Sequence, residues 1–271
     1  MGMKPNAGVI RSVVSAVLAV AWGVSAWAAE PPRAKVHVYL LLGQSNMAGR
    51  GKVEAQDREV HPRVFMLDRA GQWVPATEPV QFDRGPATGV GPGLSFGKVM
   101  AEQDPSVRIA LVPCAVGGSP ISQWRKGGGL YRTMLARAKI AAQSGVLKGI
   151  LWHQGENDSL KQEQADQYER SLHAMIAEMR EDLGVSKVPF VAAELGEFWV
   201  RRTPHAPTVN DALRRLPERV PNTACVSSKG LGHKGDQVHF SAEAARELGR
   251  RYAKALIQLR ENDNSRRKTG P

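Results

Sequence analysis

The chain has 271 residues and a formal net charge of +11 at pH 7, with 42% hydrophobic and 23% charged residues. This composition is typical of an ordinary soluble globular protein, and the length suits one large domain or two small ones. A basic surface favours anionic partners, but no nucleic-acid recognition motif is present, so we attribute the charge to solubility or attraction to an acidic polymer. No His-Glu-x-x-His or Cys-x-x-Cys pattern occurs, so no metal and no cofactor are implied.

The first 28 residues have the features of a bacterial-type export signal. Lys4 and Arg11 precede the apolar run 13–21, and small residues at 26–28 suit cleavage after Ala28. An uncleaved membrane anchor is the alternative, although the apolar run is short for a spanning helix. Because no later segment is long and apolar enough to span a bilayer, the mature protein is predicted to be soluble and periplasmic or extracellular.

The first half of the mature chain alternates predicted strands with glycine-rich turns. Strands are predicted over residues 35–42, 64–67 and 107–112, where short apolar runs are rich in β-forming residues. Residues 71–93 are dense in glycine and proline, which favours a long surface loop. A helix is predicted over residues 94–103.

The second half contains the clearest helix, residues 164–184, whose apolar side chains recur every three or four positions. Further strands are predicted at residues 149–153, 190–194 and 224–227, with helices at 131–144 and from 241 to about 259. Ser241 is the expected N-cap of the last helix, and residues 261–271 are predicted to be a disordered tail. Strands alternating with helices predict one three-layer α/β/α domain over residues 29–260, with a mostly parallel sheet of five to six strands.

The two cysteines, Cys114 and Cys225, follow or lie within different predicted strands. Export would allow them to form a disulfide, but nothing in their spacing forces them together. We therefore favour two free thiols.

A serine follows the first predicted strand in the run Gly43-Gln44-Ser45-Asn46-Met47-Ala48-Gly49. A serine at such a strand-to-loop turn can point its hydroxyl out of the carboxyl edge of the sheet, where open α/β sheets bind ligands. Serine is a weak nucleophile and needs a positioned base and an oxyanion site. The alternative is a turn that merely reverses the chain.

The sequence Asp236-Gln237-Val238-His239 supplies a candidate base. An Asp-x-x-His spacing on a turn lets the carboxylate bind one imidazole nitrogen, which leaves the other free to take the serine proton. His233 is the rival base, but no helix follows it to fix its position.

Four motifs occur in one order: Gly-Gln-Ser-Asn-Met-Ala-Gly, Val-Gly-Gly-Ser, Trp-His-Gln-Gly-Glu and Asp-x-x-His. Together they resemble the SGNH-hydrolase superfamily, which has a flavodoxin-like fold, and within it the sialate O-acetylesterase-like group. That group is also described as carbohydrate esterase family six and includes acetylxylan esterases. The resemblance runs from about Lys35 to Leu259.

The resemblance implies Ser45 as the nucleophile, His239 as the general base and Asp236 as the residue that orients it. The backbone N–H groups of Ser45 and Gly118 would face the developing oxyanion. A side-chain amide is also implied at this site, and here Gln154 is favoured, with Asn157 as the alternative.

Two further residues are expected to brace the site, namely Gln44 and Glu156. Trp124 and Trp199 are placed on predicted loops, where either could stack on a sugar ring or simply pack in the core. The resemblance thus implies an exported serine esterase that removes O-acetyl groups from a carbohydrate through an acyl-enzyme. A lipid or aryl esterase and a non-catalytic carbohydrate-binding relative remain as alternatives.

Overall fold

The computed structural model describes residues 1–2, 32–83 and 85–269, so most of the predicted export signal lies outside the described residues. Seven strands form one sheet in the order β3-β2-β4-β1-β5-β6-β7, and every neighbouring pair is parallel except β2 with β3. The strands are β1 (Val36–Gly43), β2 (Val64–Leu67), β3 (Trp73–Pro75), β4 (Arg108–Pro113), β5 (Val146–His153), β6 (Phe190–Ala193) and β7 (Thr223–Val226).

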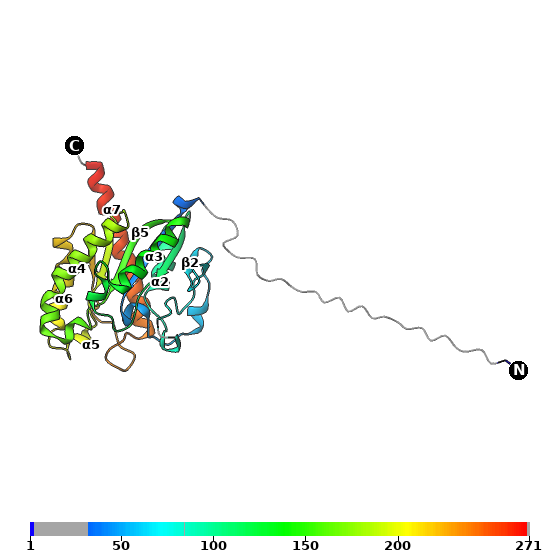
Figure 1. Cartoon of the computed structure of the whole chain (residues 1–271), viewed down its shortest axis with the longest axis horizontal. Helices are drawn as coiled ribbons and strands as arrows, with labels where there is room; N and C mark the ends of the chain where they lie inside the picture. The colour runs from blue at the N-terminus through cyan, green and yellow to red at the C-terminus, as the bar shows by residue number, and fades with distance from the viewer. Residues whose placement is uncertain (3–31, 84, 270–271) are drawn as a thin grey trace.

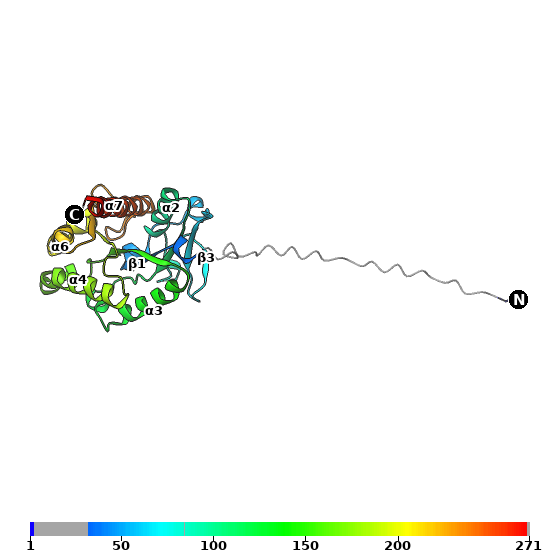
Figure 2. The same ribbon diagram turned by 90° about the horizontal axis from the view of Figure 1, so that it is seen from above.

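Helices cover both faces of this sheet (Figures 1 and 2). In Figure 2, α2 and α7 lie on one side of the sheet and α3 and α4 on the other, while α6 packs on α4. The helices are α1 (Ser45–Ala48), α2 (Gly93–Gln103), α3 (Gly129–Ser144), α4 (Gln162–Asp182), α5 (Glu197–Val200), α6 (Ala206–Arg219) and α7 (Ala242–Thr269). The predicted three-layer α/β/α architecture is confirmed.

The central strand β1 explains why the core has two halves. Successive side chains of a strand point to opposite faces, and here Leu40 and Leu42 belong to the hydrophobic cluster under α3, α4 and α6. Tyr39 and Leu41 belong to the cluster under α2 and α7. Both faces of β1 are therefore buried, as its nearly continuous apolar sequence indicates.

Three parts of the structure differ from the sequence-based prediction. The sheet has seven strands because β3 forms an antiparallel edge strand inside the segment predicted as loop. Helices α5 and α6 occupy residues for which no element is predicted. Prolines usually argue against a helix, but in α6 Pro207 lies in the first turn, where proline is tolerated, and Pro217 lies in the last turn. Finally, α7 continues to Thr269, so the prediction of a disordered tail from residue 261 is wrong for residues 261–269.

Both cysteines are free, as predicted, with Cys114 buried and Cys225 half-buried. Ser241 caps α7 as expected, since its hydroxyl accepts a 3.1 Å hydrogen bond from the backbone N–H of Ala244. Among the described residues, no helix combines the length and the apolar character needed to cross a membrane.

Candidate active site

The site forms where β4, β1 and β5 end side by side, because the carboxyl ends of parallel strands meet at one edge of the sheet. The serine loop leaves β1 through Gly43, which has a φ of +129°. A Cβ atom at Gly43 would lie 2.0 Å from the carbonyl oxygen of His153 at the end of β5. Only glycine fits there, and its close approach to β5 brings the Ser45 loop against residues 153–157.

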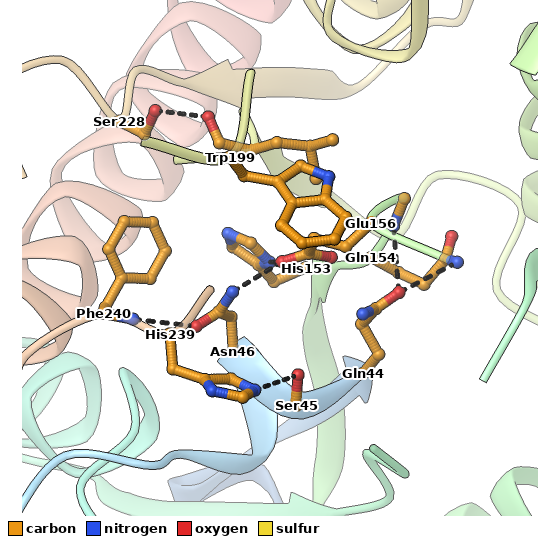
Figure 3. A network of polar contacts seen from close by, with 12 residues as sticks. Gln44, Ser45, Asn46, His153, Gln154, Glu156, Trp199, Ser228, His239 and Phe240 are labelled. Atoms are coloured by element: carbon orange, nitrogen blue, oxygen red, sulfur yellow. Dashed lines mark hydrogen bonds and ion pairs between the residues drawn. The ribbon is translucent and has the colours of Figure 1, made fainter. Parts of the chain in front are cut away.

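Ser45, His239 and Asp236 form a continuous hydrogen-bonded line (Figure 3 shows the first pair). His239 Nε2 lies 3.0 Å from Ser45 Oγ, and His239 Nδ1 lies 2.7 Å from Asp236 Oδ2. With Nδ1 donating to the carboxylate, Nε2 is unprotonated in the neutral ring and can accept the serine proton. The arrangement thus has the geometry of a nucleophile, a base and an orienting acid.

Asp236 is fixed by its own loop as well as by the histidine. Its Oδ1 accepts hydrogen bonds of 2.9 Å from the backbone N–H groups of both Val238 and His239. Partial burial opposes ionisation, but these N–H groups and the His239 ring outweigh it and hold the pKa of Asp236 below its usual range. The residue therefore orients His239 as a carboxylate.

A cleft of about 330 Å³ opens at this line and is bordered by Gln44, Ser45, Gly118, Asn157, Trp199 and His239. Ser45 itself is only 7% exposed. A larger hollow of about 400 Å³ lies between Lys148 and Arg260, at the opposite edge of the sheet, but its lining contains no serine–histidine pair. The smaller cleft is therefore the candidate active site.

Two backbone N–H groups are available beside the nucleophile. Within the described residues, neither the N–H of Ser45 nor that of Gly118 donates to another protein group. Gly118 has a φ of +73°, and a Cβ there would meet nothing within 4 Å, so its peptide borders open space. Both N–H groups are therefore without a protein acceptor beside the cleft, as donors of an oxyanion hole would have to be.

The structure does not support Gln154 as a donor to this hole. Gln154 is fully buried and does not border the cleft. An amide nitrogen has two hydrogens, and that of Gln154 already faces the carbonyl oxygen of Ser119 at 3.0 Å and the carboxylate of Asp158. The alternative, Asn157, borders the cleft and donates from Nδ2 to the carbonyl oxygen of Gly118 at 2.8 Å.

Glu156 contacts the serine loop through a residue that the sequence analysis does not single out. Glu156 Oε1 accepts a 2.6 Å hydrogen bond from Asn46 Nδ2. Asn46 also donates to the carbonyl oxygen of Val238 at 3.1 Å and accepts from the N–H of Phe240 at 3.0 Å. These are the peptide groups on either side of His239, so one buried asparagine ties the base to the nucleophile's loop (Figure 3).

Two other histidines lie near the site without the geometry of a base. His153 is fully buried, and burial lowers its pKa, so it is neutral. His233 Nδ1 accepts hydrogen bonds from the backbone N–H groups of Gly235 and Gln237 at 3.0 and 3.3 Å. His233 therefore shapes the loop that carries Asp236, and the position facing Ser45 belongs to His239.

The two candidate sugar-stacking tryptophans are in different environments. Trp124 is fully buried, packs edge-on against Trp152 and donates to Ser119 Oγ at 3.1 Å, so of its two alternatives the structure supports packing in the core. Trp199 lies on α5 rather than on a loop and borders the cleft, with its ring nitrogen bonded to Ser159 Oγ at 2.9 Å. Leu160, 57% exposed, forms an apolar rim to the same cleft.

Arg50 also borders the cleft and was not predicted from sequence. Its guanidinium pairs with Asp83 at 2.5 Å, and both side chains are nearly buried. Asp83 in turn accepts a 2.9 Å hydrogen bond from the backbone N–H of Gly117. This pair joins the serine loop to the loop that carries Gly118.

Comparison with known proteins agrees with this geometry. The model of a family described as carbohydrate esterase, sialic acid-specific acetylesterase, matches residues 35–258. A relative from Arabidopsis thaliana, described as a probable carbohydrate esterase, is 34% identical, with 81% of this chain and 90% of the relative covered.

Solved structures share the fold. An Arabidopsis thaliana protein superposes with a TM-score of 0.76 at 30% identity, covering 84% of this chain and 99% of that one. The structure of NanS gives a TM-score of 0.73 at 19% identity, covering 85% of this chain and 99% of that one. The family match over most of the chain identifies it: this protein belongs to the carbohydrate esterase family of sialic acid-specific acetylesterases and is a carboxylic ester hydrolase of the carbohydrate acetylesterase type.

Proposed function

We propose that this protein removes O-acetyl groups from an acetylated carbohydrate through a covalent acetyl-serine intermediate. The observation that carries the proposal is the line from Ser45 Oγ through His239 to Asp236, which opens onto a cleft. Ser45 Oγ attacks the acetyl carbonyl carbon while its proton passes to His239 Nε2. The tetrahedral intermediate then collapses, and the departing sugar oxygen takes that proton from the imidazole.

Hydrolysis of the acetyl-serine uses the same groups in reverse. Water donates a proton to His239 Nε2 as its oxygen attacks the acetyl carbon, and collapse of the second intermediate returns the proton to Ser45 Oγ. Acetic acid leaves and ionises in solution. Asp236 stabilises the imidazolium in both steps, and no redox partner is needed for the atoms and charges to balance.

A carbohydrate leaving group is supported by the shape of the cleft and by the family. The half-buried Trp199 and the exposed Leu160 offer apolar surface next to Ser45, and an indole face suits the apolar face of a sugar ring. A lipid or aryl esterase is the second candidate function within the same chemistry. A non-catalytic carbohydrate binder is not favoured, because carbohydrate binding alone does not require a histidine hydrogen-bonded to a serine hydroxyl.

The substrate class is tested by measuring acetate release from acetylated xylan, acetylated sialic acid and acetylated pectin, with a long-chain lipid ester and an aryl acetate alongside. We expect kcat/KM to be highest for one of the acetylated carbohydrates. Faster turnover of the lipid ester would assign the protein to the second candidate function. Absence of turnover on every ester would favour the binder.

Export is proposed from the amino-terminal sequence alone. Mass spectrometry of the protein produced in an exporting bacterial host should find a mature chain beginning at or near Ala29. Soluble protein that still begins at Met1 would contradict it.

A further inference from the structure

The segment that follows β4 is held along both of its sides, although a strand lies on only one of them. On the side of β1, the N–H groups of Cys114 and Val116 donate to main-chain carbonyl oxygens, those of Leu41 at 3.1 Å and Gly43 at 3.0 Å. On the other side, the pairing of β2 with β4 ends at Leu111. The peptide groups beyond that point need other acceptors, because buried N–H groups are costly when unpaired.

Two side chains from the loop between β3 and α2 supply these acceptors. Gln81 Oε1 accepts from the N–H of Ala115 at 3.1 Å, and Asp83 Oδ2 accepts from the N–H of Gly117 at 2.9 Å. Gln81 is 3% exposed, and the side chain of Asp83 is 4% exposed. The N–H groups of residues 114–117 thus alternate between β1 and these two side chains, which fixes the segment up to its last glycine.

The next N–H along the chain is the one that faces the cleft. Within the described residues, the N–H of Gly118 donates to no protein group, and Gly118 borders the cleft. Its carbonyl oxygen accepts from Asn157 Nδ2 at 2.8 Å. The peptide that presents this N–H is therefore held on both sides, by Asp83 through the N–H of Gly117 and by Asn157 through the carbonyl that follows.

Arg50 balances the charge of Asp83. Its Nη2 lies 2.5 Å from Asp83 Oδ2, the oxygen that also accepts from Gly117. A carboxylate this deeply buried requires a cationic or hydrogen-bonding partner. Arg50 follows the nucleophile Ser45 by five residues, and its Nη1 donates to the carbonyl oxygen of Gly49 at 2.7 Å. One carboxylate oxygen therefore joins the nucleophile's loop to the turn that presents the cleft N–H.

We propose that Asp83 is a positioning residue for the oxyanion hole. With its charge balanced by Arg50, it holds the N–H of Gly117 and so orients the next N–H, that of Gly118, toward the acetyl oxygen. This inference rests on the proposed acyl-enzyme mechanism. When Ser45 Oγ bonds to the acetyl carbon, the carbonyl electron pair moves onto oxygen, and a donor fixed in advance stabilises that charge without reorganisation. Asp83 itself touches no reacting atom, since it does not border the cleft.

Two double variants isolate the hydrogen bond from the ion pair. Arg50→Met/Asp83→Asn and Arg50→Met/Asp83→Leu both remove the two charges, and asparagine and leucine have nearly the same size. Only asparagine keeps an oxygen for the N–H of Gly117. We expect kcat for 4-nitrophenyl acetate to stay within about fivefold of wild type with asparagine and to fall by about 10- to 100-fold with leucine, with KM within about threefold in both, because a displaced donor costs rate rather than substrate binding.

The matched control is Arg246→Met/Asp57→Leu. Asp57 is also a nearly buried carboxylate that pairs with an arginine, at 2.6 Å, and accepts a backbone N–H, that of Glu54 at 2.8 Å. Neither Asp57 nor Arg246 borders the cleft, so this variant should lower the unfolding temperature and leave kcat unchanged. The rate at which a 4-nitrophenyl phosphonate labels Ser45 is measured in parallel. It should follow kcat, because the phosphoryl oxygen occupies the same hole, whereas a purely structural role would change only the unfolding temperature.

The outcomes separate the positioning role from the proposed function. If wild type turns over and is labelled, and both Asp83 double variants match it, the positioning role is wrong while the serine mechanism stands. Equal losses in the asparagine and leucine variants would also overturn it, since the ion pair or Arg50 itself would then be responsible. If wild type is neither labelled nor active, the proposed function fails and the positioning role fails with it.

Should the leucine variant not fold, amide hydrogen exchange in the wild-type protein decides. The positioning role requires the N–H of Gly117 to exchange slowly and that of Gly118 to exchange fast, and it requires phosphonylation of Ser45 to slow exchange at Gly118. If Gly117 exchanged as fast as Gly118, or if phosphonylation left Gly118 unchanged, the proposal would be overturned.

Discussion

Asn46 Nδ2 donates a 2.6 Å hydrogen bond to Glu156 Oε1, and both side chains are at most 3% exposed. Asn46 is the residue after the nucleophile, and its remaining hydrogen bonds go to the peptide groups on either side of His239. Asn46 therefore connects the Ser45 loop to the His239 segment without touching either reacting atom. Glu156 holds that side chain in place.

Replacing Asn46 with alanine should lower kcat by roughly 10- to 100-fold with KM little changed. Two hydrogen bonds to the His239 segment are lost, at about 0.5–1.5 kcal/mol each, and tenfold in rate corresponds to about 1.4 kcal/mol. Steady-state kinetics on an aryl acetate provides the measurement. An unchanged kcat in a folded Asn46→Ala variant would show that the base is positioned by other contacts.

Glu156 provides the matched comparison. Glu156→Gln keeps an oxygen that can accept from Asn46, so we expect kcat to stay within about fivefold of wild type, whereas Glu156→Ala should approach the Asn46→Ala value because the partner is then lost. Equal losses in both Glu156 variants would mean that the carboxylate charge matters, rather than the hydrogen bond to Asn46.

Asp236→Asn should reduce kcat by about three to four decades while the protein stays folded. An amide at this position no longer fixes Nδ1 of His239 as the donor, so the ring can adopt the tautomer that cannot accept the Ser45 proton. The measurement is kcat together with the unfolding temperature. A silent Asp236→Asn variant would remove Asp236 from the mechanism and make Glu156 the candidate for orienting the base.

Activity should fall in acid. A histidine can accept the serine proton only in its neutral form, and histidine is the side chain whose charge ordinarily changes between about pH 5 and 8. The pKa of Asp236 lies below its usual range, so this carboxylate is ionised throughout and adds no second step. A flat profile of kcat/KM between about pH 5 and 8 would exclude a histidine base.

Glu78 should make the protein less stable as the pH rises. Burial raises its pKa from 4.5 to about 8, so the folded state retains a proton that the unfolded state loses. Between these two values the unfolded chain binds fewer protons, and the free energy of unfolding therefore falls with increasing pH. Glu78→Gln keeps an acceptor for the N–H of Val80 and should flatten this dependence in denaturant titrations at pH 5 and pH 8. If the free energy of unfolding changed equally with pH in wild type and in Glu78→Gln, the proposed role of Glu78 would be wrong.

Sequence reasoning located the parts of the site that local patterns determine. Ser45 follows a buried strand through a glycine, and Asp236 and His239 are three residues apart on one turn, so each piece is visible in a short window. Their convergence follows from the parallel sheet, because neighbouring strands end at one edge. The periodic apolar face of α4 made that helix predictable for the same local reason.

The hydrogen bonds that position the catalytic side chains join residues far apart in the sequence, so no short sequence pattern predicts them. Asn46 meets Val238 and Phe240 across 192 and 194 residues. Likewise, Gln44 and Gln154 both lie close to the site, and the sequence does not reveal which amide nitrogen already donates to other protein groups. The structure shows that Gln154 donates inward, whereas Gln44 is tied by its oxygen. The α7 extension was missed because its last turns are polar and carry no apolar stripe.

The most direct test of the account is the turnover of Ser45→Ala beside wild type on an acetyl ester, with intact-mass analysis after phosphonate treatment. The hydroxyl supplies the nucleophile and little packing, so the variant should stay folded, lose kcat by many orders of magnitude and remain unlabelled, while wild type gains one phosphonyl group on Ser45. If Ser45→Ala retained more than about a tenth of wild-type kcat, or was labelled as wild type is, Ser45 would not be the nucleophile.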